Sequence, residues 1–302
     1  MRRGARKGRT LRLGLALVAA GGLAAAALPT GAASAEAADP HVVSGGMSGV
    51  VPARDVHAAG RGGGGGTSLL SYHNGPIMLS SVVQPIFWGT SWQSYKGDEI
   101  TGMDGFYGGL GGTSYMGTNT EYTDGNGNRV GSGVSAHASV IDNKAAPKSA
   151  PSTSAVLAEV ASVYPTPAPN AYYPVYSDQP RGSAGYCAWH STGTVNGVRV
   201  QFGFFFKLDG DGGCDPQSTY GGSEGLQALA NVSGHEISEM VTDPQLNAWY
   251  DRRGYENADK CAWTFSGKSV VIGGTNWKIQ GNFSNNAYNA NTGYVRGCID
   301  GT

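Results

Sequence analysis

Residues 223–242 give the longest helical pattern in this 302-residue chain and constrain its fold more than any other segment. Seven apolar or small residues recur there at helical spacing, namely Leu226, Leu229, Ala230, Val232, Ile237, Met240 and Val241. The same helix carries His235, Glu236 and Glu239, which are costly to bury without partners. The pattern indicates either a metal site or a solvated pair of His235 and Glu239.

His235 and Glu239 lie four residues apart, so their side chains share one face of the helix, one turn apart. An imidazole nitrogen and a carboxylate oxygen in that relation can hold one metal ion. Glu236 lies about 100° around the axis, where a general base would stand beside the ion. The pattern is that of the His-Glu-x-x-His helix of zinc hydrolases, with the second His replaced by Glu.

Glu256, seventeen residues after Glu239, is the third ligand that we predict. A downstream Glu is the third ligand in one class of zinc proteases, where a nearby Asp hydrogen-bonds a metal-bound His; Asp259 can take that second role. The predicted cofactor is Zn²⁺, which lowers the pKa of a coordinated water toward about 7. Glu236 is the predicted catalytic residue, because it can take the proton of that water.

The first 35 residues have the pattern of a secretory signal peptide. Six basic residues precede an apolar stretch over 13–28, and Ala33-Ser34-Ala35 resembles a cleavage site. The alternative is a membrane anchor, but Gly21, Gly22 and Pro29 interrupt the stretch. Removing the leader reduces Lys plus Arg from 21 to 15 against 22 acidic residues, a net charge of −7. We therefore expect a secreted, extracellular protein with no nucleic-acid partner and, after cleavage, no membrane contact.

Four cysteines, all in the last 120 residues, fit an oxidising compartment. Three pairings are open, and we favour Cys187–Cys214 with Cys261–Cys298 because each would close a local unit. The alternative, a cysteine zinc site, lacks any Cys-x-x-Cys spacing.

The remaining pattern predicts one α+β domain over residues 68–302, with a mixed sheet and a disulfide-stapled C-terminal region. Residues 36–67 are low in apolar content and include Gly62 to Gly66, so we expect a flexible linker or a pro-like segment there. Helices are expected over 98–110, 152–163 and 223–242. The run 198–207 is apolar on both faces near its end and predicts a central strand.

Six motifs follow one another over about residues 70–300: Tyr72-His73-Asn74-Gly75-Pro76, Pro85–Gly89, Cys187–His190, Gly234–Pro244, Asn247–Tyr250 and Glu256–Cys261. In this order and spacing they resemble the phosphate-induced protein, or EXORDIUM, family of secreted proteins. The resemblance implies a helix similar to a zincin active-site helix. At matching positions it points to the five residues already singled out, His235, Glu236, Glu239, Glu256 and Asp259.

His190 matches the Cys-x-x-His of that family and is a further candidate ligand or substrate-binding group, the alternative being a packed strand histidine. Two functions remain open. The first is a secreted zinc-dependent hydrolase, most simply a metallopeptidase acting on peptides. The second is a non-catalytic extracellular protein that binds a cell-wall polymer or another partner, in which the polar cluster or its metal is structural. In either case we expect a monomer.

Overall fold

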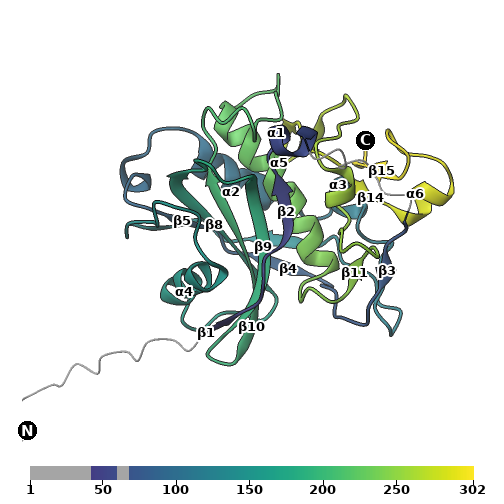
Figure 1. Cartoon of the computed structure of the whole chain (residues 1–302), viewed down its shortest axis with the longest axis horizontal. Coiled ribbons are helices and arrows are strands. Elements are labelled where there is room, and N and C mark those ends of the chain that lie inside the picture. The colour runs from purple at the N-terminus through teal and green to yellow at the C-terminus, as the bar shows by residue number, and fades with distance from the viewer. Residues whose placement is uncertain (1–41, 60–67) are drawn as a thin grey trace, which may run out of the picture. The chain divides into compact units, whose positions relative to one another are not determined.

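A mixed sheet of nine strands dominates the computed structural model, which describes residues 42–59 and 68–302 (Figure 1). Its centre consists of β8 (Ala171–Pro180), β9 (Tyr186–Val195) and β10 (Val198–Lys207). β10 pairs antiparallel with β9 and parallel with β8, so the strand with two apolar faces is central, as predicted. These features confirm the α+β class and the mixed sheet.

Four short strands extend the sheet beyond β8: β4 (Ser81–Val83), β5 (Ile86–Trp88), β6 (Val134–Ala136) and β7 (Val140–Asp142). β4 and β5 both pair parallel with β8 and are separated by Gln84 and Pro85. Proline has no N–H to donate, which explains why the β-rich run 82–88 divides there. Two short helices, η1 (Trp92–Ser94) and α3 (Ser114–Gly117), lie in the connections.

The two faces of the sheet carry different helices. On β8, Tyr176 hydrogen-bonds Ser233 of α5 (Glu224–Thr242) at 2.8 Å, so this face packs on α5, beside which lies α2 (Glu99–Leu110). Strand side chains alternate, so Tyr173 points to the opposite face. There it meets Tyr164, the C-cap of α4 (Thr153–Val163). The core therefore consists of two layers, one on each side of the sheet.

Helix α5 begins where its sequence predicts. The Ser223 hydroxyl accepts a hydrogen bond from the backbone N–H of Leu226 at 3.1 Å, an N-cap that satisfies one unpaired amide of the first turn. Its residues from Gly225 to Thr242 are buried. Burial on all sides leaves no solvated face, which excludes the alternative of an exposed pair of His235 and Glu239.

The expectation of a linker over 36–67 is wrong for the part that the structure describes. Residues 42–59, hereafter the N-terminal segment, form β1 (Val42–Ser44), β2 (Ser48–Pro52) and α1 (Arg54–Ala59). Both strands pair antiparallel with the outer edge of β9, and β2 runs alongside it in Figure 1. The backbone groups of the segment find their partners on β9. The predicted signal peptide and residues 36–41 and 60–67 lie outside the described residues.

The C-terminal region consists of short elements. They are β3 (Ser71–Tyr72) with β11 (Trp249–Tyr250), β12 (Val270–Ile272) with β13 (Thr275–Trp277), β14 (Asn282–Phe283) with β15 (Cys298–Ile299), η2 (Asp259–Cys261) and α6 (Asn285–Asn289). Two disulfides, Cys187–Cys214 and Cys261–Cys298, confirm the favoured pairing and are typical of an oxidising, extracellular environment. Within the described ranges, no helix has the length and hydropathy to span a membrane.

Candidate metal and catalytic site

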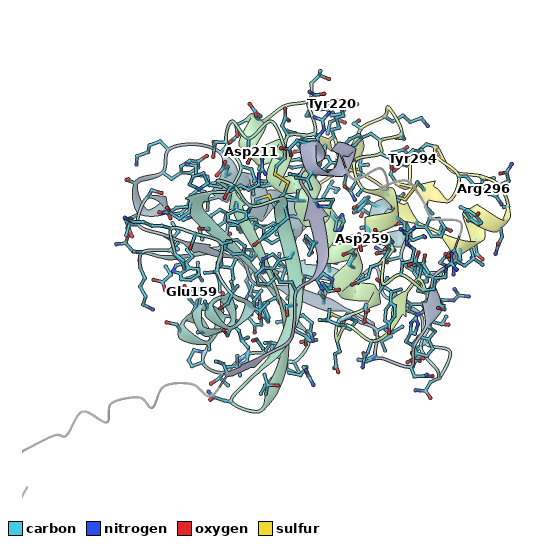
Figure 2. The ribbon with its side chains drawn as sticks, viewed as in Figure 1. Glu159, Asp211, Tyr220, Asp259, Tyr294 and Arg296 are labelled. Atoms are coloured by element: carbon cyan, nitrogen blue, oxygen red, sulfur yellow. A yellow bond between two sulfur atoms is a disulfide. The ribbon has the colours of Figure 1, made fainter. Side chains whose placement is uncertain are left out.

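Six ionisable side chains meet between α5, β9 and the turn that leads into η2. We call this set the acid–histidine cluster: His190, His235, Glu236, Glu239, Glu256 and Asp259. Five of them are 0–1% exposed, and Asp259, labelled in Figure 2 beside α5, has a side chain 12% exposed. The fold therefore brings residues from three separate stretches of sequence, including the core strand β9, into one buried space.

Glu239 lies at the centre of the acid–histidine cluster, with its two carboxylate oxygens in different surroundings. Oε1 accepts the backbone N–H of Asp259 at 2.8 Å and lies 3.1 Å from Nε2 of His235. Oε2 lies 3.6 Å from Nε2 of His190 and has no hydrogen-bond partner among the described residues. One oxygen is thus held by the protein, and the other keeps its lone pairs for a further ligand.

His190 joins Glu239 to Glu256. Its Nε2 lies 3.3 Å from Oε1 of Glu256 and 3.6 Å from Oε2 of Glu239. Four ligands at tetrahedral positions with bonds of about 2.0 Å stand about 3.3 Å from one another. The contact between His190 and Glu256 is a hydrogen bond, and both separations are also close to those of donor atoms around one cation.

His235 has its tautomer fixed by Gln280. The Gln280 amide nitrogen lies 2.8 Å from Nδ1 of His235 and donates to the carbonyl of Ala258 at 3.0 Å, while its oxygen accepts the N–H of Trp263. The amide can therefore present only a donor to His235, so Nδ1 accepts and Nε2 carries the proton. Nε2 lies 3.1 Å from Glu239 Oε1 and 3.5 Å from Asp259 Oδ1, without forming a hydrogen bond to a described residue. In this tautomer Nε2 is protonated and is not offered to a metal.

Glu236 lies against the His190 side of Glu239. Donor atoms of His190, Glu236 and Glu239 all fall within 4.8 Å of one another, as do those of His235, Glu239 and Asp259. Neither oxygen of Glu236 has a hydrogen-bond partner among the described residues. Burial, only partly offset by the nearby histidines, raises the pKa of Glu236 well above its usual value.

The acid–histidine cluster contains an excess of acid. Four of its members are carboxylic acids, and Asp243 adds a fifth beside Glu256. Burial and the neighbouring carboxylates raise the pKa of both Glu239 and Asp243 to about 7. Burial lowers the pKa of His190, but the negative charge of Glu256 and its neighbours outweighs this and raises it to about 10. Such an arrangement is stabilised by a divalent cation, which supplies the missing positive charge.

The donor atoms available for a cation lie mainly on the His190 side. Oε2 of Glu239, Oε2 of Glu256 and both oxygens of Glu236 have no hydrogen-bond partner among the described residues. Nitrogen and carboxylate donors in this mixture suit Zn²⁺ and also harder divalent ions. The residues therefore fit a metal ion, and the structure leaves the identity of that ion open.

The predicted site residues thus fall into two overlapping groups. Asp259 lies 3.5 Å from Nε2 of His235, the nitrogen that also faces Glu239, while Glu256 contacts His190. Among the described residues, the predicted ligands His235, Glu239 and Glu256 do not fall into one group of donor atoms within 4.8 Å of one another. Sequence reasoning missed Gln280, Ser48 and Gly49, and no pattern around them distinguishes them from loop residues. Ser48 donates to Glu256 Oε1 at 2.6 Å, and Gly49 lies against Glu239 and His190.

Comparisons of this chain with protein-family models, curated proteins and solved structures found no match.

Proposed function

We propose that this chain is a secreted, divalent-cation-dependent hydrolase that cleaves peptide bonds, with Zn²⁺ as the cation. One observation carries the proposal: Glu236 is fully buried beside His190 and Glu239, and both its oxygens lack a partner among the described residues. Structural carboxylates at such depth are normally hydrogen-bonded. A buried acid with a raised pKa in a cation-binding arrangement is typical of a general base or acid.

Donor atoms of His190, Glu236 and Glu239 lie within 4.8 Å of one another, and Glu256 contacts His190 at 3.3 Å. In this proposal His190 and Glu239 would hold the ion, with Glu256 as the third ligand. A bound Zn²⁺ would supply Lewis-acid chemistry toward the scissile carbonyl. Glu236 would take a proton from the attacking water and give it to the leaving amine. His235 and the Asp259 N–H would keep Glu239 in place through Oε1, and Gln280 would hold the ring of His235.

Other parts of the proposal come from the sequence. The basic, then apolar, leader supports export, and the two disulfides agree with it. The zincin-like reading of α5 and membership of the phosphate-induced protein family belong to the same proposal. They depend on the His-Glu-x-x-Glu pattern and on the six motifs around it.

A second function is favoured by the burial of the acid–histidine cluster. Glu236 is 0% exposed, so no substrate reaches it in this conformation. A non-catalytic extracellular protein, with a structural metal and a surface for a cell-wall polymer or another partner, would also have a sealed cluster.

The substitution Glu236→Gln tests the hydrolase. It keeps the shape of the side chain and removes the base, so we expect peptide turnover to fall by about 10²- to 10⁴-fold with zinc content retained. Glu224→Gln is the matched control, because Glu224 is exposed in the first turn of the same helix. Turnover is measured with a peptide library, and zinc by elemental analysis of the purified protein. Undiminished turnover in the Glu236→Gln variant, or a metal-free protein after purification with zinc, would refute the proposal.

A further inference from the structure

The N-terminal segment is bound to the sheet in the way an extended peptide binds. β1 and β2 pair antiparallel with β9, whose other edge is occupied by β10. Without the N-terminal segment, β9 would be an edge strand with unpaired backbone groups next to His190. Addition of an extended chain to such an edge is a common mode of peptide recognition.

Three side chains of the protein donate hydrogen bonds to backbone carbonyls of this segment. Ser191 donates to the carbonyl of Gly46 at 2.6 Å, Thr153 to that of Gly45 at 2.9 Å, and the Trp263 indole to that of Pro52 at 2.7 Å. The side chains of Val51 and Ala53 are fully buried. Carbonyl groups and two buried apolar side chains therefore contribute to the recognition of the segment.

The pairing with β9 is interrupted at the acid–histidine cluster. Between Ser48, opposite His190, and Val51, opposite Ala188, the register shifts. Gly49 lies in this interruption with φ of 51°, a conformation that suits glycine. A side chain at Gly49 would collide with Oε2 of Glu239 and the imidazole of His190. The adjacent Ser48 hydroxyl donates to Glu256. The two residues therefore cover the donor atoms on the His190 side.

We propose that β9 borders a groove for an extended polypeptide, and that the N-terminal segment occupies this groove and blocks the acid–histidine cluster until it is displaced. This inference rests on the proposed function, because blocking the acid–histidine cluster has a consequence only if that cluster is the hydrolytic site. It also names the substrate class: an extended polypeptide with glycine packed against the side chains of His190 and Glu239 and a small apolar residue two positions later. On this inference, Glu236 is buried because the N-terminal segment covers the acid–histidine cluster.

Gly49 provides the test, and Gly46 provides its control. Gly46 lies in the same segment, but a side chain there would meet nothing within 4 Å. In the full-length exported chain, Gly49→Val should expel the segment, whereas Gly46→Ala should leave it bound. A fluorescent peptide of residues 42–59 is then added and its anisotropy measured. We expect it to bind the Gly49→Val chain at least tenfold more tightly than the wild-type or Gly46→Ala chains.

Two further measurements keep the test decisive. If near-UV circular dichroism shows that Gly49→Val is misfolded, residues 62–66 are replaced by the recognition sequence of a specific protease. After cleavage, the cut wild-type protein is exchanged against excess labelled peptide. The wild-type and Gly46→Ala peptides should bind at least tenfold more tightly than the Gly49→Val peptide. Equal affinities, or no binding to either protein, would overturn the inference.

The outcome is separable from that of the hydrolase proposal. Peptide binding is measured in the Glu236→Gln background as well, where turnover is absent. Glycine-dependent binding without turnover in the Glu236-containing protein supports the groove and refutes the hydrolase. Turnover without glycine-dependent binding supports the hydrolase and refutes the groove.

Discussion

Two buried groups of charged side chains lie close together in the sequence, and they differ in the partners that neutralise their carboxylates. Asp251 and Lys260 form an ion pair at 3.0 Å with side chains 0% and 1% exposed. Asp251 also accepts the backbone N–H groups of Arg253 and Tyr255. Burial raises the pKa of Asp251, but the N–H of Arg253 and the Lys260 ammonium hold it below its usual value.

The acid–histidine cluster is buried to the same depth, and the pKa values of Glu236 and Glu239 are raised. The difference lies in the partners. Asp251 has a lysine and two backbone amides, whereas the ion pairs of Glu239, Glu256 and Asp259 among the described residues are with His190 and His235. Asp251 is paired by the chain itself, whereas neither oxygen of Glu236 has a hydrogen-bond partner among the described residues, as is also true of the buried Glu99 on α2. We infer that the acids of α5, which lie beside His190 and His235, take up a cation that the chain does not provide.

The largest expected effect comes from removing the cation of the paired region. Lys260→Met leaves Asp251 buried without its ammonium partner and should lower the free energy of unfolding by about 3–5 kcal/mol. Urea unfolding at pH 7 with intact disulfides measures this value. Lys268→Met, at an exposed position, is the control and should change stability by less than about 0.5 kcal/mol. If Lys260→Met and Lys268→Met had equal free energies of unfolding, the buried Asp251 would not need the Lys260 ammonium. The comparison between the two buried regions would then be refuted.

A smaller effect distinguishes the two histidines of the acid–histidine cluster. His190→Ala removes a proposed ligand, so zinc affinity should fall by about 100-fold or more, equivalent to about 2.7 kcal/mol. His235→Gln keeps an N–H donor for Glu239 and should lower affinity by about tenfold or less. Competition with a chromogenic chelator gives both values. The reverse order would place the cation between His235 and Asp259.

The smallest effect concerns an acid pair distant from the acid–histidine cluster. Burial, followed by the neighbouring Asp142, raises the pKa of Glu159 on α4 to about 8 (Figure 2). Unfolded Glu159 loses its proton near 4.5, so between pH 4.5 and 8 the folded state binds more protons and stability falls as pH rises. Glu159→Gln removes this loss.

Denaturant unfolding of the wild type and of Glu159→Gln at pH 5 and pH 9 checks that sign. The variant should match the wild type at pH 5 and exceed it by about 2 kcal/mol at pH 9, a value reduced by solvent screening. A variant with the same pH profile as the wild type would show that burial alone does not shift these acids. The inference from the raised pKa values of α5 would then be weakened as well.

The patterns that predicted correctly are local ones. The apolar spacing located α5, and the doubly apolar end of 198–207 identified the central strand. The cysteine pairs followed from their grouping along the chain. In each case, neighbours in sequence carry enough information, because helix caps, strand alternation and short disulfide loops depend on residues near one another.

The patterns that failed involve distant partners. The N-terminal segment was expected to be a linker, but β9 provides the backbone partners with which it forms strands. The role of Gln280 depends on Ala258, Trp263 and His235 meeting at one amide group. None of these contacts has a spacing that a linear pattern could reveal.

The sequence by itself determined which chemical groups are available: a histidine and two acids on one buried helix, a further acidic pair downstream, and four cysteines in two local pairs. Only the tertiary structure decided which nitrogen faces which oxygen. It placed His190 between Glu239 and Glu256, brought Nε2 of His235 close to Glu239, and laid Gly49 over the acid–histidine cluster. The physical reason is that hydrogen bonds and cation sites are decided at distances of about 3 Å. Separation along the chain does not fix such distances when the groups come from different elements.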